Sequence, residues 1–236
     1  MSTYSIIVRT RNEEKYIERC LSAIRMQENI EDLEIILIDN ASIDSTLSIA
    51  TPYIDELLTI DKFLPGRALN LGVSHARHEF IVMISGHCIP QSKDWLYELS
   101  LPFHKETNSP REIIGVYGRQ IPEFDSKALD KRDLWNTFGE EDRLQVRDVF
   151  FHNANSIVRR DTLIKYPFSE KVTNVEDRLW GKEMITNGYA LYYASRAIVY
   201  HWHGINHAGD ESRADKVVKV FEENQIYTIP EPSFGI

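Results

Sequence analysis

The sequence predicts an α/β fold, a Rossmann-like, doubly wound and mostly parallel sheet in a single domain of 236 residues. Short apolar strands alternate with amphipathic helical stretches in the first half of the chain, an order that is typical of a parallel sheet. The apolar runs are continuous rather than alternating, which indicates that helices cover both faces of the sheet. An apolar fraction of 42% and a charged fraction of 27% are ordinary for a protein with a buried core.

Each element of the first half has the pattern of its class. The strands are short runs of β-branched and large apolar residues, and we expect them at 4–10, 33–39, 56–61 and 78–85. The helices carry apolar residues three and four positions apart, as Ile17, Leu21 and Ile24 do in the first of them. We expect these helices at 13–27, 42–53 and 67–77.

The second half of the chain is less regular. Residues 123–148 are rich in charge and weakly periodic, so we predict a mobile segment with short helices there. Elsewhere we expect helices from near Ser92 to 105, at 175–189 and at 211–224, and strands at 113–121, 190–194 and 197–201. We divide the single domain 1–236 into halves at 1–105 and 106–236.

Composition argues against several classes of protein. A formal net charge of −9 is unsuited to non-specific nucleic-acid binding, so we expect no nucleic-acid partner. Two cysteines are too few for a disulfide scaffold and indicate a reducing compartment. Residues 1–15 hold only a short apolar run flanked by charge, and no run approaches the ~20 apolar residues of a spanning helix. We therefore expect a cytoplasmic protein without a signal peptide.

Polar residues follow the predicted strands at the edge where open α/β sheets bind ligands. Thr10, Asn12 and Glu13 follow the first strand, although Asn12 and Glu13 can equally cap the next helix. Asp39 ends the second strand, where a carboxylate typically accepts hydrogen bonds from a ribose or a base. The fourth strand ends in Ser85-Gly86-His87.

The order and spacing of these motifs resemble the family 2 glycosyltransferases, whose fold is the GT-A nucleotide-sugar domain. The resembling stretches lie within residues 4–203 and are "TRNEE", "DNASIDST", "GRALNLGVSHARHEFIVMIS", "VYGRQIP", "NANSIVRRD", "EDRLW" and "YHWH". "VYGRQIP" and "NANSIVRRD" look most like the branch that contains bacterial rhamnosyltransferases. Residues 1–105 would then be the nucleotide-binding half, and 106–236 the acceptor-side half with a C-terminal helix.

This resemblance implies an activity and its partners. The enzyme would move a hexosyl or deoxyhexosyl group, with inversion, from a UDP- or dTDP-sugar to a hydroxyl of a glycan or glycolipid in polysaccharide biosynthesis. Peripheral association with the inner face of the membrane is compatible with such an acceptor. We expect the nucleotide-sugar to contact Thr10, Asn12, Glu13, Asp39, Arg67, Ser85 and His87.

The triplet Ser85-Gly86-His87 stands where the resembling family has Asp-X-Asp, which holds a divalent metal ion, Mn²⁺ or Mg²⁺, at the donor diphosphate. Both carboxylates are absent, whereas a neutral His87 can coordinate such an ion. The family's C-terminal histidine implies that His201 or His203 completes the metal site, although a hydrogen-bonded pair also explains two histidines that share one side of an extended segment. Without a metal, an imidazolium at His87 would neutralise the diphosphate, together with Arg67 or Arg119.

Inverting transfer needs a carboxylate that takes the proton of the attacking hydroxyl. Glu176 and Asp177 begin a predicted helix, where capping alone would also explain carboxylates. The resemblance favours Asp177 as the base, with Glu176 in reserve. We place Asn155 and Arg119 on the acceptor side.

Two alternatives compete with this interpretation. A non-catalytic module that binds sugar nucleotides would explain the lost Asp-X-Asp, but it would not be expected to keep the Glu-Asp pair and both C-terminal histidines. A nucleotidyltransferase shares the order of the strands, but its glycine-rich phosphate loop is missing after the first strand. A dinucleotide fingerprint is missing there too, which argues against an oxidoreductase.

Overall fold

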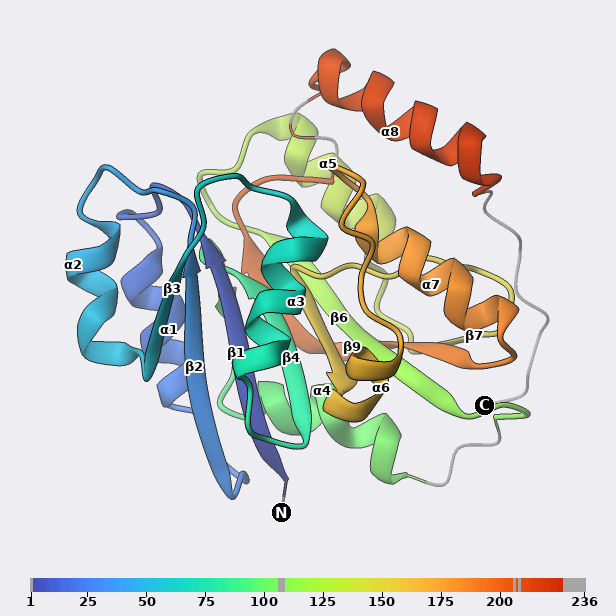
Figure 1. The fold of residues 1–236 in the computed structure, drawn as a ribbon, viewed down its shortest axis with the longest axis horizontal. Helices are drawn as coiled ribbons and strands as arrows, with labels where there is room; N and C mark the ends of the chain where they lie inside the picture. Colours follow the sequence, from blue (N-terminus) through green and yellow to red (C-terminus); the bar gives the residue numbers. More distant parts are fainter. Residues whose placement is uncertain (1, 106–108, 206, 208, 227–236) are drawn as a thin grey trace.

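Nine strands form one sheet in the order β3-β2-β1-β4-β8-β6-β9-β5, with β7 paired to β9 (Figure 1). The structure, a computed structural model, describes residues 2–105, 109–205, 207 and 209–226. The strands are β1 (Thr3–Thr10), β2 (Asp32–Asp39), β3 (Glu56–Thr59), β4 (Phe80–Ser85), β5 (Cys88–Pro90), β6 (Ile113–Pro122), β7 (Arg143–Gln145), β8 (Asn155–Arg159) and β9 (Ala190–His201). The helices are α1 (Ile17–Arg25), α2 (Thr46–Ala50), α3 (Pro65–His75), α4 (Trp95–His104), α5 (Ala128–Thr137), α6 (Arg160–Lys165), α7 (Glu176–Thr186) and α8 (Glu211–Asn224), with a 3₁₀ turn at Thr51–Tyr53.

The first half of the chain forms the parallel part of the sheet, as predicted. β1 runs parallel to β2 and to β4, and β2 runs parallel to β3. In this register Thr10 is the partner of Asp39, and Arg9 is the partner of Ser85. The carboxyl ends of β1, β2 and β4 therefore meet at one edge of the sheet.

The second half adds strands of mixed direction. β8 lies antiparallel between β4 and β6, while β9 runs parallel to β6 and antiparallel to β5 and β7. The two strands predicted at 190–194 and 197–201 are one strand, β9, which shifts its register against β6 between Gly118 and Gln120. The predicted boundary between the halves falls at residues 106–108, outside the described residues.

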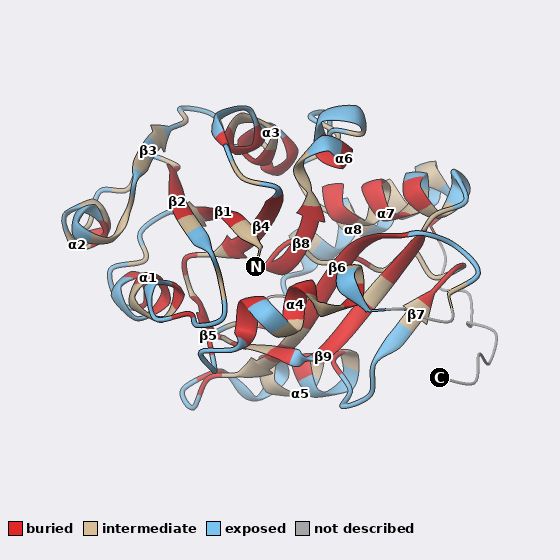
Figure 2. Ribbon diagram, turned by 90° about the horizontal axis from the view of Figure 1, so that it is seen from below, coloured by how far each residue is buried: buried red, intermediate tan, exposed pale blue. Residues whose placement is uncertain are grey.

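Two apolar cores cover the two faces of the sheet, and this explains the continuous apolar runs of the strands. Successive side chains of a strand point to opposite faces, so Ile6 and Val8 of β1 enter one core and Ile7 enters the other. The first core includes α1 and α4, and the second includes α3, α6 and α7. Figure 2 shows the buried central strands between these two helical layers.

The segment 123–148 contains one helix, in line with the short helices predicted there, and a strand that was not predicted. These are the ten-residue helix α5 and the short strand β7. Leu134 and Phe138 are buried in the second core, and Asp130 is buried as well. Because a buried aspartate interrupts the apolar side of α5, the helical period is weak in the sequence.

The C-terminal helix α8 lies at one side of the molecule, above the end of α7 (Figure 1). None of its residues is buried. Its Arg213 donates a hydrogen bond to Asn174, just before α7, with 2.6 Å between Nη1 and Oδ1. Across the described ranges, neither α8 nor any other helix has the length and apolar character needed to cross a membrane.

Candidate active site

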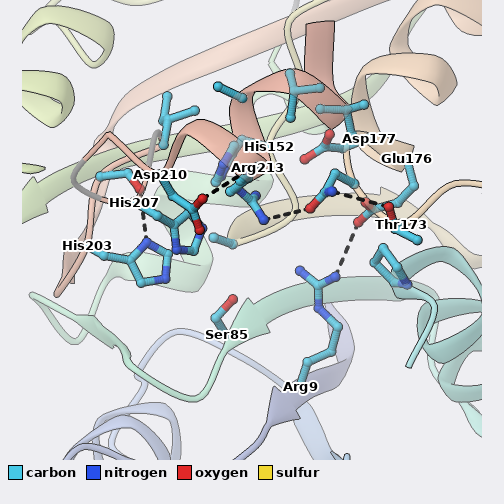
Figure 3. A pocket seen from close by; sticks show the side chains of 18 of the residues that line it. Arg9, Ser85, His152, Thr173, Glu176, Asp177, His203, His207, Asp210 and Arg213 are labelled. Carbon is cyan, nitrogen blue, oxygen red and sulfur yellow. Dashed lines mark hydrogen bonds and ion pairs between the residues drawn. The ribbon is translucent and has the colours of Figure 1, made fainter. Parts of the chain in front are cut away.

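A pocket of about 700 Å³ opens at the carboxyl ends of β1 and β4 (Figure 3). Its other walls are the start of α7, the end of β9 with the loop that follows, and one side of α8. Eight of the residues predicted from the sequence line it together: Thr10, Glu13, Ser85, His87, Glu176, Asp177, His201 and His203. The pocket therefore joins the strand-end residues of the first half to the acid pair and the histidines of the second half.

Three histidines of the pocket each use Nδ1 in a hydrogen bond to an oxygen. His87 Nδ1 lies 2.6 Å from Glu13 Oε1, and His201 Nδ1 lies 2.6 Å from Gln120 Oε1. His203 Nδ1 lies 3.0 Å from the carbonyl oxygen of Gly204. A neutral imidazole that donates from Nδ1 keeps a lone pair on Nε2. If all three rings are neutral and donate from Nδ1, their Nε2 atoms are left free to accept.

Two of these Nε2 atoms lie close together, and the ring of His203 lies beside them. His87 Nε2 and His201 Nε2 are 3.2 Å apart, and the ring centre of His203 lies 4.6 Å and 4.4 Å from those of His87 and His201. Two lone pairs at this distance repel each other unless a cation lies between them. Two nitrogens ~2.1 Å from a shared ion, at an angle near 100°, would be about 3.2 Å apart. The cluster therefore fits a metal ion.

Burial keeps His201 and His203 in the neutral form that binds metal. It lowers the pKa of His201 well below its ordinary value, and nearby histidines lower it further. The same causes lower the pKa of His203 to about 2. Cys88 lies in the same cluster, since one ligand atom each of His87, Cys88 and His201 fall within 4.8 Å of one another. Burial raises the pKa of the Cys88 thiol.

Gln120 and His152 support this cluster, and the sequence analysis missed both. The Gln120 side chain accepts from His201 through Oε1 and donates to His152 Nδ1 at 2.9 Å through Nε2. One amide thus sets the tautomer of two histidines. Gln120 is fully buried within β6. A single amide inside an apolar strand was the sequence signal that could have identified it as a buried polar residue.

The acid pair begins α7. Asp177 accepts from two backbone N–H groups, that of Asn153 at 3.2 Å and that of Arg178 at 2.8 Å. Glu176 Oε1 accepts from Arg9 Nη1 at 3.2 Å and from Asn153 Nδ2 at 3.4 Å. Burial and the neighbouring Asp177 raise the pKa of Glu176, while the Arg9 guanidinium opposes that shift. The two carboxylates therefore have different surroundings.

Asn155, which was predicted on the acceptor side, lies within the sheet and is not among the described residues that line the pocket. It is fully buried, and its Oδ1 accepts from Trp95 Nε1 at 2.9 Å. Its Nδ2 donates to the carbonyl oxygens of Arg119 at 3.1 Å and Ala197 at 2.8 Å. The side chain therefore connects β8 to the backbones of β6 and β9, and a ligand would have to compete for groups that are already bonded.

Two more predicted residues hold the loop after β2. Asp39 accepts from Ser42 Oγ at 2.5 Å and from Ser42 N at 3.0 Å. Asn12 Oδ1 accepts from Ile43 N at 2.9 Å. Neither is among the described residues that line the pocket. A carboxylate has about four acceptor positions and an amide also has two N–H donors, so contact between a nucleoside and Asp39 or Asn12 stays a prediction.

The two arginines predicted to neutralise the diphosphate lie elsewhere. Arg67 is exposed on the first turn of α3, and Arg119 pairs with Glu140 at 3.1 Å. Neither belongs to the pocket wall within the described ranges. Arg9 of β1 and Arg213 of α8 line it instead. The sequence signal for Arg9 was a single charge in an otherwise uncharged strand.

Comparison with known proteins gives matches in sequence. The model of the family described as "Glycosyl transferase family 2" matches residues 5–166. The O-antigen chain rhamnosyltransferase WbaN of Salmonella anatum is 27% identical over 183 residues, which cover 72% of this chain and 56% of that protein. The chain thus spans little more than half of this relative.

Solved structures are similar in fold. The mannosyltransferase PcManGT from Pyrobaculum calidifontis, in complex with GDP-Man and Mn²⁺, has a TM-score of 0.69 at 21% identity, with 97% of this chain and 66% of that chain covered. Residues 1–349 of TarS from S. aureus, in complex with UDP-GlcNAc, have a TM-score of 0.64 at 17% identity, with 93% and 66% covered. The predicted GT-A fold is confirmed.

Proposed function

The chain belongs to glycosyl transferase family 2, and from this premise we propose that it is an inverting glycosyltransferase. It would move a sugar from a nucleoside diphosphate to a hydroxyl of a glycan or glycolipid. The observation that carries the proposal is the joint placement, in one pocket, of the acid pair and the neutral histidine cluster. The acid pair would accept the proton of the acceptor hydroxyl. The histidine cluster would lie at the leaving diphosphate.

The nucleoside would lie at the ends of β1 and β2. The hydroxyl of Thr10 is buried at the pocket wall and has no hydrogen-bond partner among the described residues. A buried hydroxyl without a partner is costly, and a ribose or base would supply one. Asp39, the neighbour of Thr10 across the β1–β2 pair, would accept a second hydrogen bond from the nucleoside.

Asp177 would be the general base. Its carboxylate lies in the first turn of α7, accepts two backbone hydrogen bonds and lines the pocket. Glu176 instead accepts from two side chains, Arg9 and Asn153, which lie between it and an acceptor in the proposed arrangement. The Asp177 carboxylate would take the proton as the acceptor oxygen attacks the anomeric carbon, and the sugar–phosphate bond would break on the opposite side.

His87, His201 and His203 would hold a divalent metal ion. A donor set rich in imidazole suits Mn²⁺ or another transition metal better than Mg²⁺. Bound there, such an ion would neutralise charge that develops on the departing diphosphate. Glu13 and Gln120 orient two of the rings through their Nδ1 atoms, a kind of support that tunes metal ligands in general.

A UDP- or dTDP-linked hexose or deoxyhexose is the proposed donor. A curated relative is named a rhamnosyltransferase, and a similar solved structure is in complex with UDP-GlcNAc. Both names are compatible with the donors expected from the sequence. Action at the inner face of a membrane would follow if the acceptor is a glycolipid.

A thermal-shift panel tests the proposal. UDP, dTDP, GDP and CMP are each added with and without Mn²⁺, since a ligand that binds the native state raises the melting temperature. We expect a rise with UDP or dTDP that is larger with Mn²⁺. If none of the four nucleotides changes the melting temperature, the proposed function is wrong.

Activity measured with His87→Ala then tests the metal. Wild type and variant are compared with EDTA or added Mn²⁺, over about one pH unit on either side of the ordinary histidine pKa of ~6.5. We expect EDTA to abolish transfer and activity to fall as the pH is lowered, because metal ligation needs neutral imidazole. Activity that resists EDTA but is lost in His87→Ala would leave His87 as a phosphate contact.

A further inference from the structure

Arg9 lines the pocket near the end of strand β1. It is the penultimate residue of β1 and the register partner of Ser85 in β4. Its side chain extends toward the start of α7, with Ser85 beside it in the close-up of the pocket (Figure 3). The guanidinium therefore lies between the Ser85-Gly86-His87 triplet and the acid pair, where the reacting groups of donor and acceptor would meet.

The hydrogen-bonding capacity of Arg9 is only partly used. A guanidinium has five N–H donors, and those of Arg9 reach Glu176 Oε1 at 3.2 Å and the carbonyl oxygen of Asn153 at 3.5 Å within the described part of the chain. Both distances exceed the ~2.7–2.9 Å of a strong charge-assisted bond. The side chain is 15% exposed, at the pocket wall. It therefore has donors left for a ligand.

The other arginines of the pocket are less suited to a ligand at the triplet. Arg178 packs on the ring of Phe150, with its guanidinium carbon 3.6 Å from the ring centre. Arg213 bonds to Asn174 from the α8 side, and Arg11 is exposed. Arg9 is rooted in the central sheet beside the triplet, which lacks both carboxylates of the usual metal site. A fixed cation at this place is suited to a diphosphate.

We infer that Arg9 binds the diphosphate of the donor, giving up part of its contact with Glu176 to do so. The inference rests on the proposed function, because it presupposes a nucleoside diphosphate in this pocket. It makes Glu176 a competitor of the diphosphate for one guanidinium. Removing the cation and removing its competitor should therefore change diphosphate affinity in opposite directions.

Calorimetric titration with UDP, UMP and uridine separates the phosphate contact from the nucleoside contact. Hydrogen bonds to charged groups contribute ~1.5–3 kcal/mol, so we expect Arg9→Gln to weaken UDP binding about 10- to 150-fold and to leave uridine binding within about two-fold. Arg9→Lys keeps the charge but loses the forked geometry, and should lie between. Glu176→Gln replaces the charged contact with Arg9 by a neutral and weaker one, so it should bind UDP more tightly than wild type.

A matched control and the opposing outcomes make the test decisive. Arg25→Gln removes an exposed arginine that pairs with Asp55 at the end of α1, and it should leave all three affinities unchanged. Equal UDP affinity in wild type and Arg9→Gln overturns the inference, as does an equal loss for UDP and uridine. If Arg9→Gln does not fold, UDP affinity is compared among wild type, Arg9→Lys and Glu176→Gln. Weaker UDP binding in Glu176→Gln than in wild type then overturns the inference. If wild type binds no nucleotide, the proposed function fails and the inference falls with it.

Discussion

Replacing Asp177 with asparagine should lower the rate of sugar transfer by ~10²-fold or more, because an amide cannot take the proton of the acceptor hydroxyl. The substitution keeps the size of the side chain but changes its hydrogen bonding. Both Asp177 oxygens accept from backbone N–H groups, at 3.2 Å from Asn153 and 2.8 Å from Arg178. Asparagine offers one oxygen, so one of these N–H groups would face an NH₂ group instead.

The structural cost of this change follows from the burial of the site. Asp177 is 8% exposed, and a buried donor without a partner costs about 1–3 kcal/mol. For a chain of this size, each 1 kcal/mol lowers the melting temperature by roughly 2–4 °C. Asp177→Asn should therefore be folded but less stable, and its donor affinity should stay near that of wild type.

The assay is steady-state transfer from a UDP- or dTDP-sugar, run well below the melting temperature of the variant. Glu176→Gln is the matched control, because the oxygen of glutamine can still accept from Arg9 and Asn153. We expect that control to keep its turnover within about ten-fold of wild type. A folded Asp177→Asn enzyme with turnover within a few-fold of wild type would refute Asp177 as the base, and a larger loss in Glu176→Gln would move the role to Glu176.

Three further predictions concern binding and stability. Asp39→Ala should weaken nucleotide binding by ~1.5–3 kcal/mol, and unchanged affinity of the folded variant in a calorimetric titration would remove Asp39 from the site. Asn155→Ala removes three hydrogen bonds, two of them buried, so the free energy of unfolding in urea should fall by ~3 kcal/mol or more. A loss under about 1 kcal/mol would contradict the connecting role of Asn155. Burial lowers the pKa of His201 in the folded state, so the unfolded state binds more protons below pH ~6.5 and stability in EDTA should fall with falling pH, by up to ~1.4 kcal/mol per pH unit for this group. His201→Gln should show a shallower fall, and an identical pH profile would argue against this cause.

The sequence predicted the parallel half of the sheet because burial on both faces leaves a strong pattern. β1, β2 and β4 send alternate side chains into two separate cores, so their apolar runs are unbroken. The bounds of the helix α5 could not be predicted, for the opposite reason. Its inward side includes Asp130, whose Oδ1 accepts from the backbone of Gly204 at 2.8 Å, and a partner so distant in sequence leaves no local pattern.

The part of the candidate site that lies at the strand ends was predictable, because the fold class determines where these ends meet. Residues at strand ends meet at one edge in a doubly wound sheet, so Thr10, Ser85 and His87 were expected together. The motif "NANSIVRRD" indicated a segment of the site, in which Asn153 contacts the acid pair and Asn155 lies inside the sheet. Asn153 and Asn155 are only two positions apart. Packing against other strands decides which of them lies inside the sheet, and these contacts are not local in sequence.

The way helix α8 is attached has an evolutionary consequence. It lines the pocket with Ala214, Val217, Val218 and Phe221, yet contributes no buried residue to either core. Lys182 of α7 holds its last turn through the carbonyl oxygen of Asn224, and substitutions of unburied residues usually change stability by less than ~0.5 kcal/mol. Selection can therefore vary this wall with little effect on folding. The α8 side of the pocket can diverge between lineages to suit new acceptors while β1, β4 and α7 retain the chemistry.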